Sequence, residues 1–229
     1  EPAALTGRHA RYSIDGFAFA PDGTIYFVGS DLGDTGRDFV GRNGALYRLG
    51  ADGAPAQRLT DPSATDLSDG AHELMVASDG AVLAQNTWRG AVELVSIDSR
   101  GELSRVVAGD RVVRGFDEAA GNVVVSYLDA ATMGDVAVVR KGDIATLTDF
   151  SSALRDAGVA PPVELTVPAG DGTPVHGWVL APAGDGPHPV LLNIHGGPYT
   201  QYTGSFFDEA QVYVAAGYGV VMCNPRGAS

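Results

Sequence analysis

Residues 16–28 read GFAFAPDGTIYFV, two short apolar runs on either side of a Pro-Asp-Gly turn. Runs of this length that are rich in aromatic and β-branched residues are typical of strands, and an Asp-Gly pair tolerates the positive φ of a tight hairpin. The pattern returns at residues 73–84, ELMVASDGAVLA, with Ser-Asp-Gly as the turn. The sequence therefore predicts a β-hairpin that opens a repeated unit.

The repeated unit holds four strand-like runs, and three copies follow one another. The copies end at Thr60, Val107 and Thr148, so that successive ends lie 47 and 41 residues apart. This is the period of four-stranded propeller blades, roughly 40 to 50 residues. An alternative is a β-sandwich with regular turns. The predicted strands are 16–20, 24–28, 45–49 and 57–60 in the first copy, 73–77, 81–84, 92–97 and 103–107 in the second, and 112–117, 123–127, 136–139 and 144–148 in the third.

Residues 1–150 are thus predicted to form a partial β-propeller of about three blades. Leu5 and Thr6 are expected to form the last strand of a preceding blade. Because a propeller needs about four or more blades to close, further blades are expected upstream of this chain. The insertion at residues 31–38 carries Gly33 and Thr35 where a calcium loop needs acidic side chains, so we expect no metal there, and no cofactor for the chain.

Composition excludes several classes of partner. With 15 Lys and Arg against 28 Asp and Glu, the net charge of −13 repels phosphate backbones and anionic membrane surfaces. We therefore expect no nucleic acid and no membrane as partner, the more so because no apolar stretch reaches about 18 residues. Cys223 is the only cysteine, which rules out an intrachain disulfide and suits a cytoplasmic location.

The pattern changes near residue 150. Residues 151–162 are small and polar and end in a Pro-Pro pair, which predicts a linker. Two strand-like runs, 163–167 and 175–180, then flank Gly-Asp-Gly as a hairpin, and an apolar strand at 189–194, a helix at 207–216 closed by Gly217, and a strand at 220–223 follow. Strand, loop, helix, strand is a βαβ unit with a parallel sheet, in which Leu191 to Ile194 are expected inside the sheet rather than at its edge.

His195-Gly196-Gly197-Pro198 lies where the apolar strand hands over to the helix. From this position α/β-hydrolases supply a backbone amide to an oxyanion hole, which stabilises the charge of a tetrahedral intermediate. Two glycines permit a sharp turn and a close approach of that amide to a substrate oxygen. A tight turn without catalytic role fits these four residues equally well.

The stretch Pro189-Val-Leu-Leu-Asn-Ile-His-Gly-Gly-Pro198, followed by Phe206-Phe207, Gln211, Gly217-Tyr218 and Asn224-Pro-Arg-Gly227, resembles the prolyl oligopeptidase family of serine peptidases. Within it, the resemblance is to acylaminoacyl-peptidase-like bacterial members. It implies that residues 163–229 form the N-terminal part of an α/β-hydrolase domain capped by the propeller. It also implies hydrolysis of short or N-acylated peptides by a Ser-Asp-His triad, an oxyanion-hole amide at Gly197, and a substrate pocket near Phe206 or Phe207.

The chain departs from the family because it lacks the Gly-x-Ser-x-Gly nucleophile elbow. Ser205 and Ser229 lack the flanking glycines of that motif, and none of the five histidines (His9, His72, His176, His188 and His195) is assigned as the triad base. The triad is therefore expected beyond the end of this chain, which would be an inactive interior piece of a peptidase. The expected partners are a peptide substrate and the remainder of the same protein, with a homo-oligomer also possible.

Two other functions fit the same residues. One is a non-catalytic propeller binding module whose hydrolase-like tail completes its surface. The other is a small-ester hydrolase with the same His-Gly-Gly loop, although such enzymes do not usually carry propeller blades. A nucleophile elbow within a few tens of residues after Ser229 is the feature that would separate a peptidase from a binding module.

Overall fold

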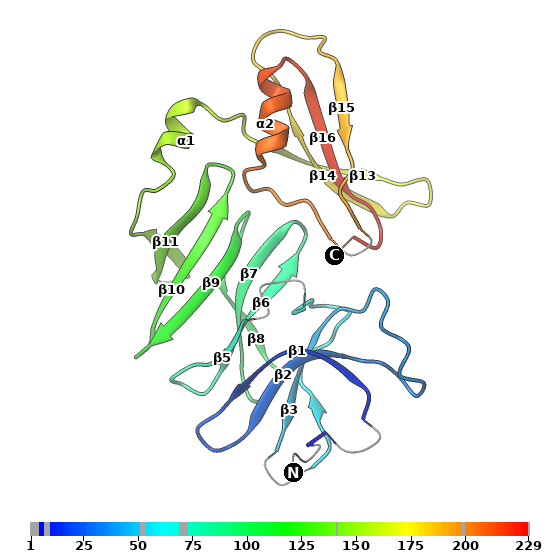
Figure 1. Ribbon diagram of the computed structural model, residues 1–229, viewed down its shortest axis with the longest axis vertical. Coiled ribbons are helices and arrows are strands. Elements are labelled where there is room, and N and C mark those ends of the chain that lie inside the picture. Colours follow the sequence, from blue (N-terminus) through cyan, green and yellow to red (C-terminus); the bar gives the residue numbers. More distant parts are fainter. Residues whose placement is uncertain are drawn as a thin grey trace.

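The computed structural model describes residues 5–6, 10–50, 54–68, 73–140, 142–197 and 200–228. These residues form three sheets and two helices, with the sheets of the N-terminal part below and the C-terminal unit above them in Figure 1. None of the helices in this part of the chain is long and apolar enough to cross a bilayer.

Blade 1 is a four-stranded antiparallel sheet in the order of the chain. Its first hairpin is the one predicted at residues 16–28: Phe17 pairs with Phe27, and Gly23 turns with a φ of 87°. Leu5 and Thr6 form a bend and take part in no strand pairing, so the strand predicted there is wrong. The pair Asp52-Gly53, which predicts a turn between the third and fourth strands, lies outside the described residues. The strands are β1 (Tyr12–Phe19), β2 (Ile25–Asp31), β3 (Ala45–Leu49) and β4 (Gln57–Arg58).

Blades 2 and 3 are two further antiparallel units of four strands each. They differ from the prediction of separate sheets because β7 and β9 pair in parallel at Val92 and Val112, where the Val92 amide donates to the Arg111 carbonyl over 2.9 Å. One sheet of eight strands results. Blade 2 consists of β5 (Leu74–Val76), β6 (Val82–Trp88), β7 (Ala91–Ile97) and β8 (Leu103–Val107), and blade 3 of β9 (Val112–Ala119), β10 (Asn122–Asp129), β11 (Thr132–Arg140) and β12 (Asp143–Thr146).

The predicted ends of the three copies occupy equivalent places. The Oγ1 atom of Thr60 accepts a hydrogen bond from the amide of Leu46, and Oγ1 of Thr148 accepts one from the amide of Val136, both over 2.9 Å. Val107 lies at the matching place in blade 2, opposite Leu94. The repeat read from the sequence is therefore a repeat of positions beside the third strand of each blade, where a threonine hydroxyl accepts a hydrogen bond from that strand in blades 1 and 3.

Two apolar cores hold the blades face to face. The cluster between blades 1 and 2 and the cluster between blades 2 and 3 each draw side chains from both neighbours, so burial of apolar surface joins the blades. The first contains Tyr26, Val28, Leu46, Leu67, Val82, Ala84, Val95 and Ile97. The second contains Leu83, Leu94, Val107, Val113, Val125, Tyr127 and Ala137.

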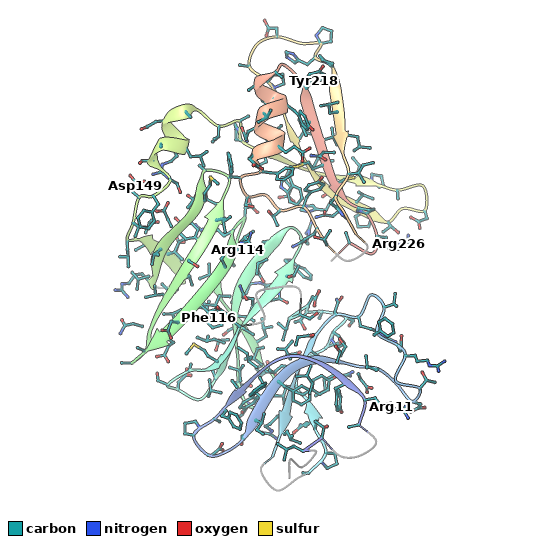
Figure 2. All side chains as sticks on the ribbon, viewed as in Figure 1. Arg11, Arg114, Phe116, Asp149, Tyr218 and Arg226 are labelled. Carbon is teal, nitrogen blue, oxygen red and sulfur yellow. The ribbon has the colours of Figure 1, made fainter. Side chains whose placement is uncertain are left out.

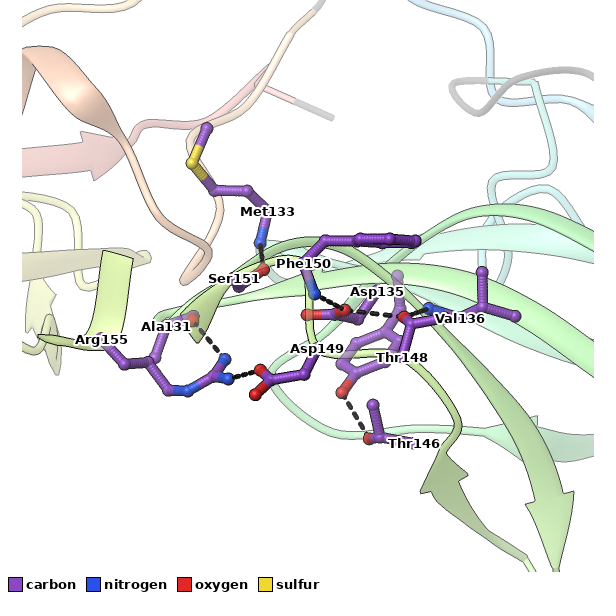
Figure 3. A network of polar contacts seen from close by, with 11 residues as sticks. Ala131, Met133, Asp135, Val136, Thr146, Thr148, Asp149, Phe150, Ser151 and Arg155 are labelled. Atoms are coloured by element: carbon purple, nitrogen blue, oxygen red, sulfur yellow. Dashed lines mark hydrogen bonds and ion pairs between the residues drawn. The ribbon is translucent and has the colours of Figure 1, made fainter. Parts of the chain in front are cut away.

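A buried carboxylate closes blade 3. Asp135, only 1% exposed, accepts hydrogen bonds from the Thr148 hydroxyl and the Phe150 amide, each over 2.7 Å (Figure 3). Nearby, the Ser151 hydroxyl accepts a bond from the Met133 amide over 3.0 Å. The contacts fix the exit of the chain from blade 3 into the segment 151–162, which contains a short helix, α1 (Ser152–Ala157), that the sequence analysis did not predict.

The C-terminal unit is a four-stranded sheet with one helix. β13 and β14 form the predicted hairpin, which turns at Gly172 with a φ of 83°, and β15 and β16 are parallel. The helix α2 lies within the predicted range of 207–216 and is followed by Gly217 as predicted, which adopts a φ of 93° and donates to the Val214 carbonyl over 2.9 Å. The elements are β13 (Val163–Pro168), β14 (Pro174–Leu180), β15 (Val190–Asn193), α2 (Asp208–Ala215) and β16 (Gly219–Asn224).

The position of β15 corrects the sequence analysis. The strand order is β13-β14-β16-β15, so the apolar strand pairs with β16 alone and lies at the edge of the described sheet. Val190 is 63% exposed, Leu192 60% and Ile194 78%. After α2 the chain returns between β14 and β15. The later strand, β16, therefore occupies the inner position that was predicted for β15.

Candidate functional site

The loop with the His-Gly-Gly sequence leaves the end of β15. The Nδ1 atom of His195 donates to the carbonyl oxygen of Gly196 over 2.6 Å, which fixes the tautomer because a carbonyl can only accept. The imidazole meets the ring of Tyr202 edge-on, with centroids 5.3 Å apart. Its Nε2 atom is buried without a hydrogen-bond partner among the described residues. Its position is thus fixed by the loop it belongs to.

Gly196 and Gly197 are both exposed, and neither has a φ in the left-handed region. A Cβ added to either would meet nothing within 4 Å. Neither glycine therefore uses the conformational freedom that the predicted sharp turn would require. Because Gly197 has no Cβ, its backbone is open on its outer side. Pro198, the next residue of the motif, lies outside the described residues.

The segment 200–207 packs against this loop and is fixed by Asn224. The side-chain amide of Asn224 donates to the Tyr202 carbonyl over 2.9 Å and accepts from the Tyr202 amide over 2.8 Å. The Tyr202 ring then lies between His195 and Phe207, whose ring centroid is 5.7 Å away. Burial, followed by the charge of Glu209 and then by Cys223, raises the pKa of Tyr202. The residues of the Asn-Pro-Arg-Gly motif thus hold the segment beside the loop.

The same segment is bonded to the blades. The amide of Gly90, at the tip of the β6–β7 hairpin, donates to Oε1 of Gln201 over 2.9 Å, and the Gly204 amide donates to the Gly90 carbonyl over 3.2 Å. The Phe206 amide donates to the carbonyl of Asp129 over 2.9 Å. Segment 200–207 therefore has one set of contacts to the C-terminal unit and another to blades 2 and 3.

An open pocket of about 490 Å³ lies beside this segment, between blade 3 and the C-terminal unit. Gly196, Phe206 and Phe207 line it together, so the structure brings both predicted phenylalanines beside the residue that precedes Gly197. Arg114 lines the pocket from the blade side, and Figure 2 shows it at the end of the blade sheet that faces the C-terminal unit. Sequence reasoning missed Arg114, because nothing in its own strand distinguishes it from an ordinary solvated arginine.

The charges in the pocket come from opposite walls. Glu209, in the first turn of α2, lines it with Arg114. The Tyr213 hydroxyl donates to Oε1 of Glu209 over 2.7 Å, and this bond, with the charge of Glu209, raises the pKa of Tyr213. No ion pair joins Arg114 and Glu209 among the described residues.

Other residues of the family resemblance hold the architecture. The side chain of Gln211 bonds both the amide and the carbonyl of Ala160, each over 2.9 Å, and so ties α2 to the segment before β13. Arg226 pairs with Asp171 in the β13–β14 turn, and the Thr173 hydroxyl is 2.5 Å from the same guanidinium. These contacts explain why such residues accompany the loop, and they involve no chemistry.

The hydroxyl and imidazole groups form no catalytic set among the described residues. Ser205 Oγ lies 2.6 Å from the hydroxyl of Thr203, His176 contacts Glu164 and the Trp178 ring, and His188 Nε2 lies 3.3 Å from the Gly184 carbonyl. His9, His72 and Ser229 lie outside the described residues.

Known proteins share parts of this sequence and its architecture. No family model matches the chain. It is 43% identical over 77 residues, 32% of its length, to an uncharacterized peptidase, YuxL, of Bacillus subtilis (strain 168), and spans 12% of that protein. Its fold matches acylaminoacyl peptidase of Pyrococcus horikoshii with a TM-score of 0.75 at 20% identity, over 95% of this chain and 33% of that one. It matches dipeptidyl peptidase 4 of Porphyromonas gingivalis with a TM-score of 0.70 at 20% identity, over 93% and 30% of the two chains.

The β-rich architecture is therefore that of the β-propeller part of such peptidases. The resemblance to the prolyl oligopeptidase family is confirmed, by sequence to a peptidase over a third of the chain and by fold over nearly all of it. The chain spans about a third of the length of the matched structures and about an eighth of the matched sequence relative.

Proposed function

We propose that the chain is part of a serine-type peptidase of the prolyl oligopeptidase family that hydrolyses short or N-acylated peptides. In this proposal residues 1–150 belong to its propeller, 151–162 are the linker, and 163–229 are the N-terminal part of its α/β-hydrolase domain. The observation that carries the proposal is the 43% identity to a peptidase over 77 residues. The parallel β15–α2–β16 arrangement supports it, because open α/β sheets bind ligands beyond the carboxyl ends of their strands.

The proposed chemistry assigns separate tasks to the residues around the pocket. The backbone N–H of Gly197 donates to the carbonyl oxygen of the scissile bond as that oxygen gains negative charge in the tetrahedral intermediate. Phe206 and Phe207 contact the side chain of the substrate residue before that bond. A serine attacks the carbonyl carbon, the amine leaves with a proton delivered by a histidine, and water hydrolyses the acyl-enzyme. The triad is assigned to residues outside these 229, in keeping with the third of a peptidase chain that they cover.

The test uses the full-length protein with chromogenic acyl-peptide and amino-acyl substrates. Hydrolysis that a serine-directed phosphonate abolishes is expected, whereas residues 1–229 alone should show none. A full-length protein that binds peptides without cleaving them would overturn the proposal in favour of a binding module. Cleavage of simple esters with no cleavage of peptides would favour an esterase instead. A cytoplasmic location is part of the proposal and rests on the single cysteine, Cys223.

A further inference from the structure

Arg114 is one of five arginines, with Arg11, Arg37, Arg58 and Arg89, whose side chains make no ion pair or hydrogen bond among the described residues, and of these five it alone lines the pocket beside Gly196. Six arginines of the described residues form ion pairs with carboxylates, as expected for a chain in which acidic residues outnumber basic ones by 28 to 15. The side chain of Arg114, on the first strand of blade 3 (β9), forms neither an ion pair nor a hydrogen bond within this part of the chain. Arg114 instead lines the pocket that contains Gly196 and the two phenylalanines.

The pocket also holds polar atoms that have no partner. Nδ2 of Asn193 and Nε2 of His195 are buried and make no hydrogen bond within the described ranges. Both residues line the pocket with Arg114. A buried polar group without a partner costs about 1–3 kcal/mol, so a polar occupant would stabilise this pocket more than an apolar one. Asn193 Nδ2 is a donor and His195 Nε2, in the tautomer fixed by Gly196, is an acceptor, so the two atoms together fit a peptide group, by an observation that is independent of the arginine.

The charge of the pocket selects the chemistry of that occupant. Its one carboxylate among the described lining residues, Glu209, is bonded by the Tyr213 hydroxyl and does not pair with Arg114. An anionic ligand is repelled by the net charge of −13 unless the pocket supplies a local cation. A guanidinium presents two parallel N–H donors that match the two oxygens of a carboxylate.

We propose that Arg114 binds a carboxylate of the peptide substrate on the blade side of the pocket and is thereby a specificity-determining residue. The inference rests on the proposed peptidase function and adds to it the class of substrate, a peptide with an anionic group. That group is either the C-terminal carboxylate or an acidic side chain, which share the same chemistry. Gly197, which follows the lining residue Gly196, and the two phenylalanines then contact the part of the peptide that contains the scissile bond.

The experiment uses the full-length protein and three peptides with one backbone. They are an acetylated Ala-Ala-Phe-Ala with a free C-terminal carboxylate, its C-terminal amide, and the amide with Asp in place of the last Ala. Affinity is measured by calorimetry on versions N-methylated at the peptide bonds, which are not cleaved, and kcat and KM on the unmethylated peptides. The variants are Arg114→Gln, Arg114→Lys, and Arg140→Gln as the matched control. Arg140 is an exposed arginine of the same blade whose guanidinium, among the described residues, bonds only the Val139 carbonyl.

Arg114→Gln is expected to weaken binding of the carboxylate peptides by about 10- to 100-fold, the range of a hydrogen bond to a charged group, and to leave the amide unchanged. Arg114→Lys should retain part of the preference, and Arg140→Gln all of it. Whichever carboxylate peptide loses more affinity shows whether Arg114 binds the C-terminal carboxylate or the acidic side chain. Unfolding in urea should be unchanged in all three variants because both arginines are exposed.

Equal losses for the carboxylate and amide peptides, or no loss for either, would overturn the inference. The two proposals fail separately. Peptides that bind through Arg114 but are never cleaved would keep the carboxylate site and remove the peptidase function. If the wild type and Arg114→Gln both cleave the peptides and show the same preference between carboxylate and amide, the peptidase function stands and the carboxylate site at Arg114 is removed.

Discussion

Gly90 and Trp178 touch across the boundary between blade 2 and the C-terminal unit: a Cβ added at Gly90 would lie 2.1 Å from Cη2 of the indole. Gly90 also has a φ of 78°, a conformation that side chains rarely adopt. Two independent constraints therefore act on one residue at the tip of a hairpin. One is local to the turn, and the other comes from a side chain 88 positions away in the sequence.

Gly90→Ala is expected to destabilise the protein by more than its conformation alone explains. The left-handed φ costs about 1–2 kcal/mol, and the clash with Trp178 adds about 1–3 kcal/mol. Gly121→Ala is the matched control, because Gly121 has a φ of 79° and open space where the Cβ would be. Urea unfolding of the full-length variants measures the difference, and equal losses in the two would show that the indole yields without cost.

Asn224→Ala should destabilise the protein by about 2 kcal/mol, since it leaves the amide and the carbonyl of Tyr202 without partners. Asn224→Asp keeps the acceptor for the Tyr202 amide and loses the donor to its carbonyl, so an intermediate loss is expected. Asn122→Ala serves as control in an exposed turn, where the side chain reaches two carbonyls at 3.4 Å. The near-ultraviolet circular dichroism should change in Asn224→Ala and not in Asn122→Ala. An unchanged signal in Asn224→Ala would show that other contacts hold the Tyr202 ring.

The stability of the protein should depend on Asp135 below neutral pH. The hydrogen bond from the Thr148 hydroxyl, with those from Phe150 and Ser151, lowers the pKa of this carboxyl below its usual value of about 3.9. A carboxyl with a lowered pKa in the folded state contributes stability above its unfolded pKa, and that contribution is lost as the pH falls through the folded value. Wild type should therefore lose stability below about pH 4 more steeply than Asp135→Asn.

The pH experiment compares urea midpoints between pH 7 and pH 2.5. Asp185→Asn provides the reference, because Asp185 is exposed and forms no hydrogen bond or ion pair among the described residues. Parallel curves for wild type and Asp135→Asn would contradict the assignment of the acid sensitivity to the carboxylate that closes blade 3.

Gly197→Val tests the proposed oxyanion donor without a folding penalty. A Cβ at Gly197 meets nothing within 4 Å, so the free energy of unfolding should change by no more than about 0.5 kcal/mol. Gly170→Val, at another open position far from the pocket, is the stability control. In the full-length protein kcat is expected to fall by about 10²-fold as the side chain crowds the oxyanion, whereas Gly170→Val should keep it. Undiminished kcat in a folded Gly197→Val protein would remove Gly197 from the proposed mechanism.

Local signals in the sequence predicted the blades well. The spacing of Thr60, Val107 and Thr148 identified equivalent positions beside the third strand of each blade, because a repeated unit repeats its contacts. The hairpin turns followed from glycines that adopt positive φ. The pair Gly121-Asn122 predicts the β9–β10 turn, but the residues with positive φ are Ala120 and Gly121, one position earlier.

The arrangement of strands and the pocket could not be predicted in the same way. An apolar strand reads alike at the centre and at the edge of a sheet, so the place of β15 depends on where the chain returns after α2. The contact of Gly90 with Gln201 joins residues 111 positions apart, and no periodicity reports it. The exposed Arg114 becomes notable only beside Gly196 and Phe206, which the fold brings to it.

The double attachment of segment 200–207 has a thermodynamic consequence. A ligand that fills the pocket binds only the arrangement in which Asn224 holds one flank of the segment and Gly90 and Asp129 hold the other. Linkage is reciprocal, so such a ligand opposes separation of the blades from the C-terminal unit by the same free energy with which separation opposes its binding. Ligand binding to the pocket and the association of the two units are thus coupled equilibria. A ligand at one hundred times its Kd favours the associated state by about 2.7 kcal/mol.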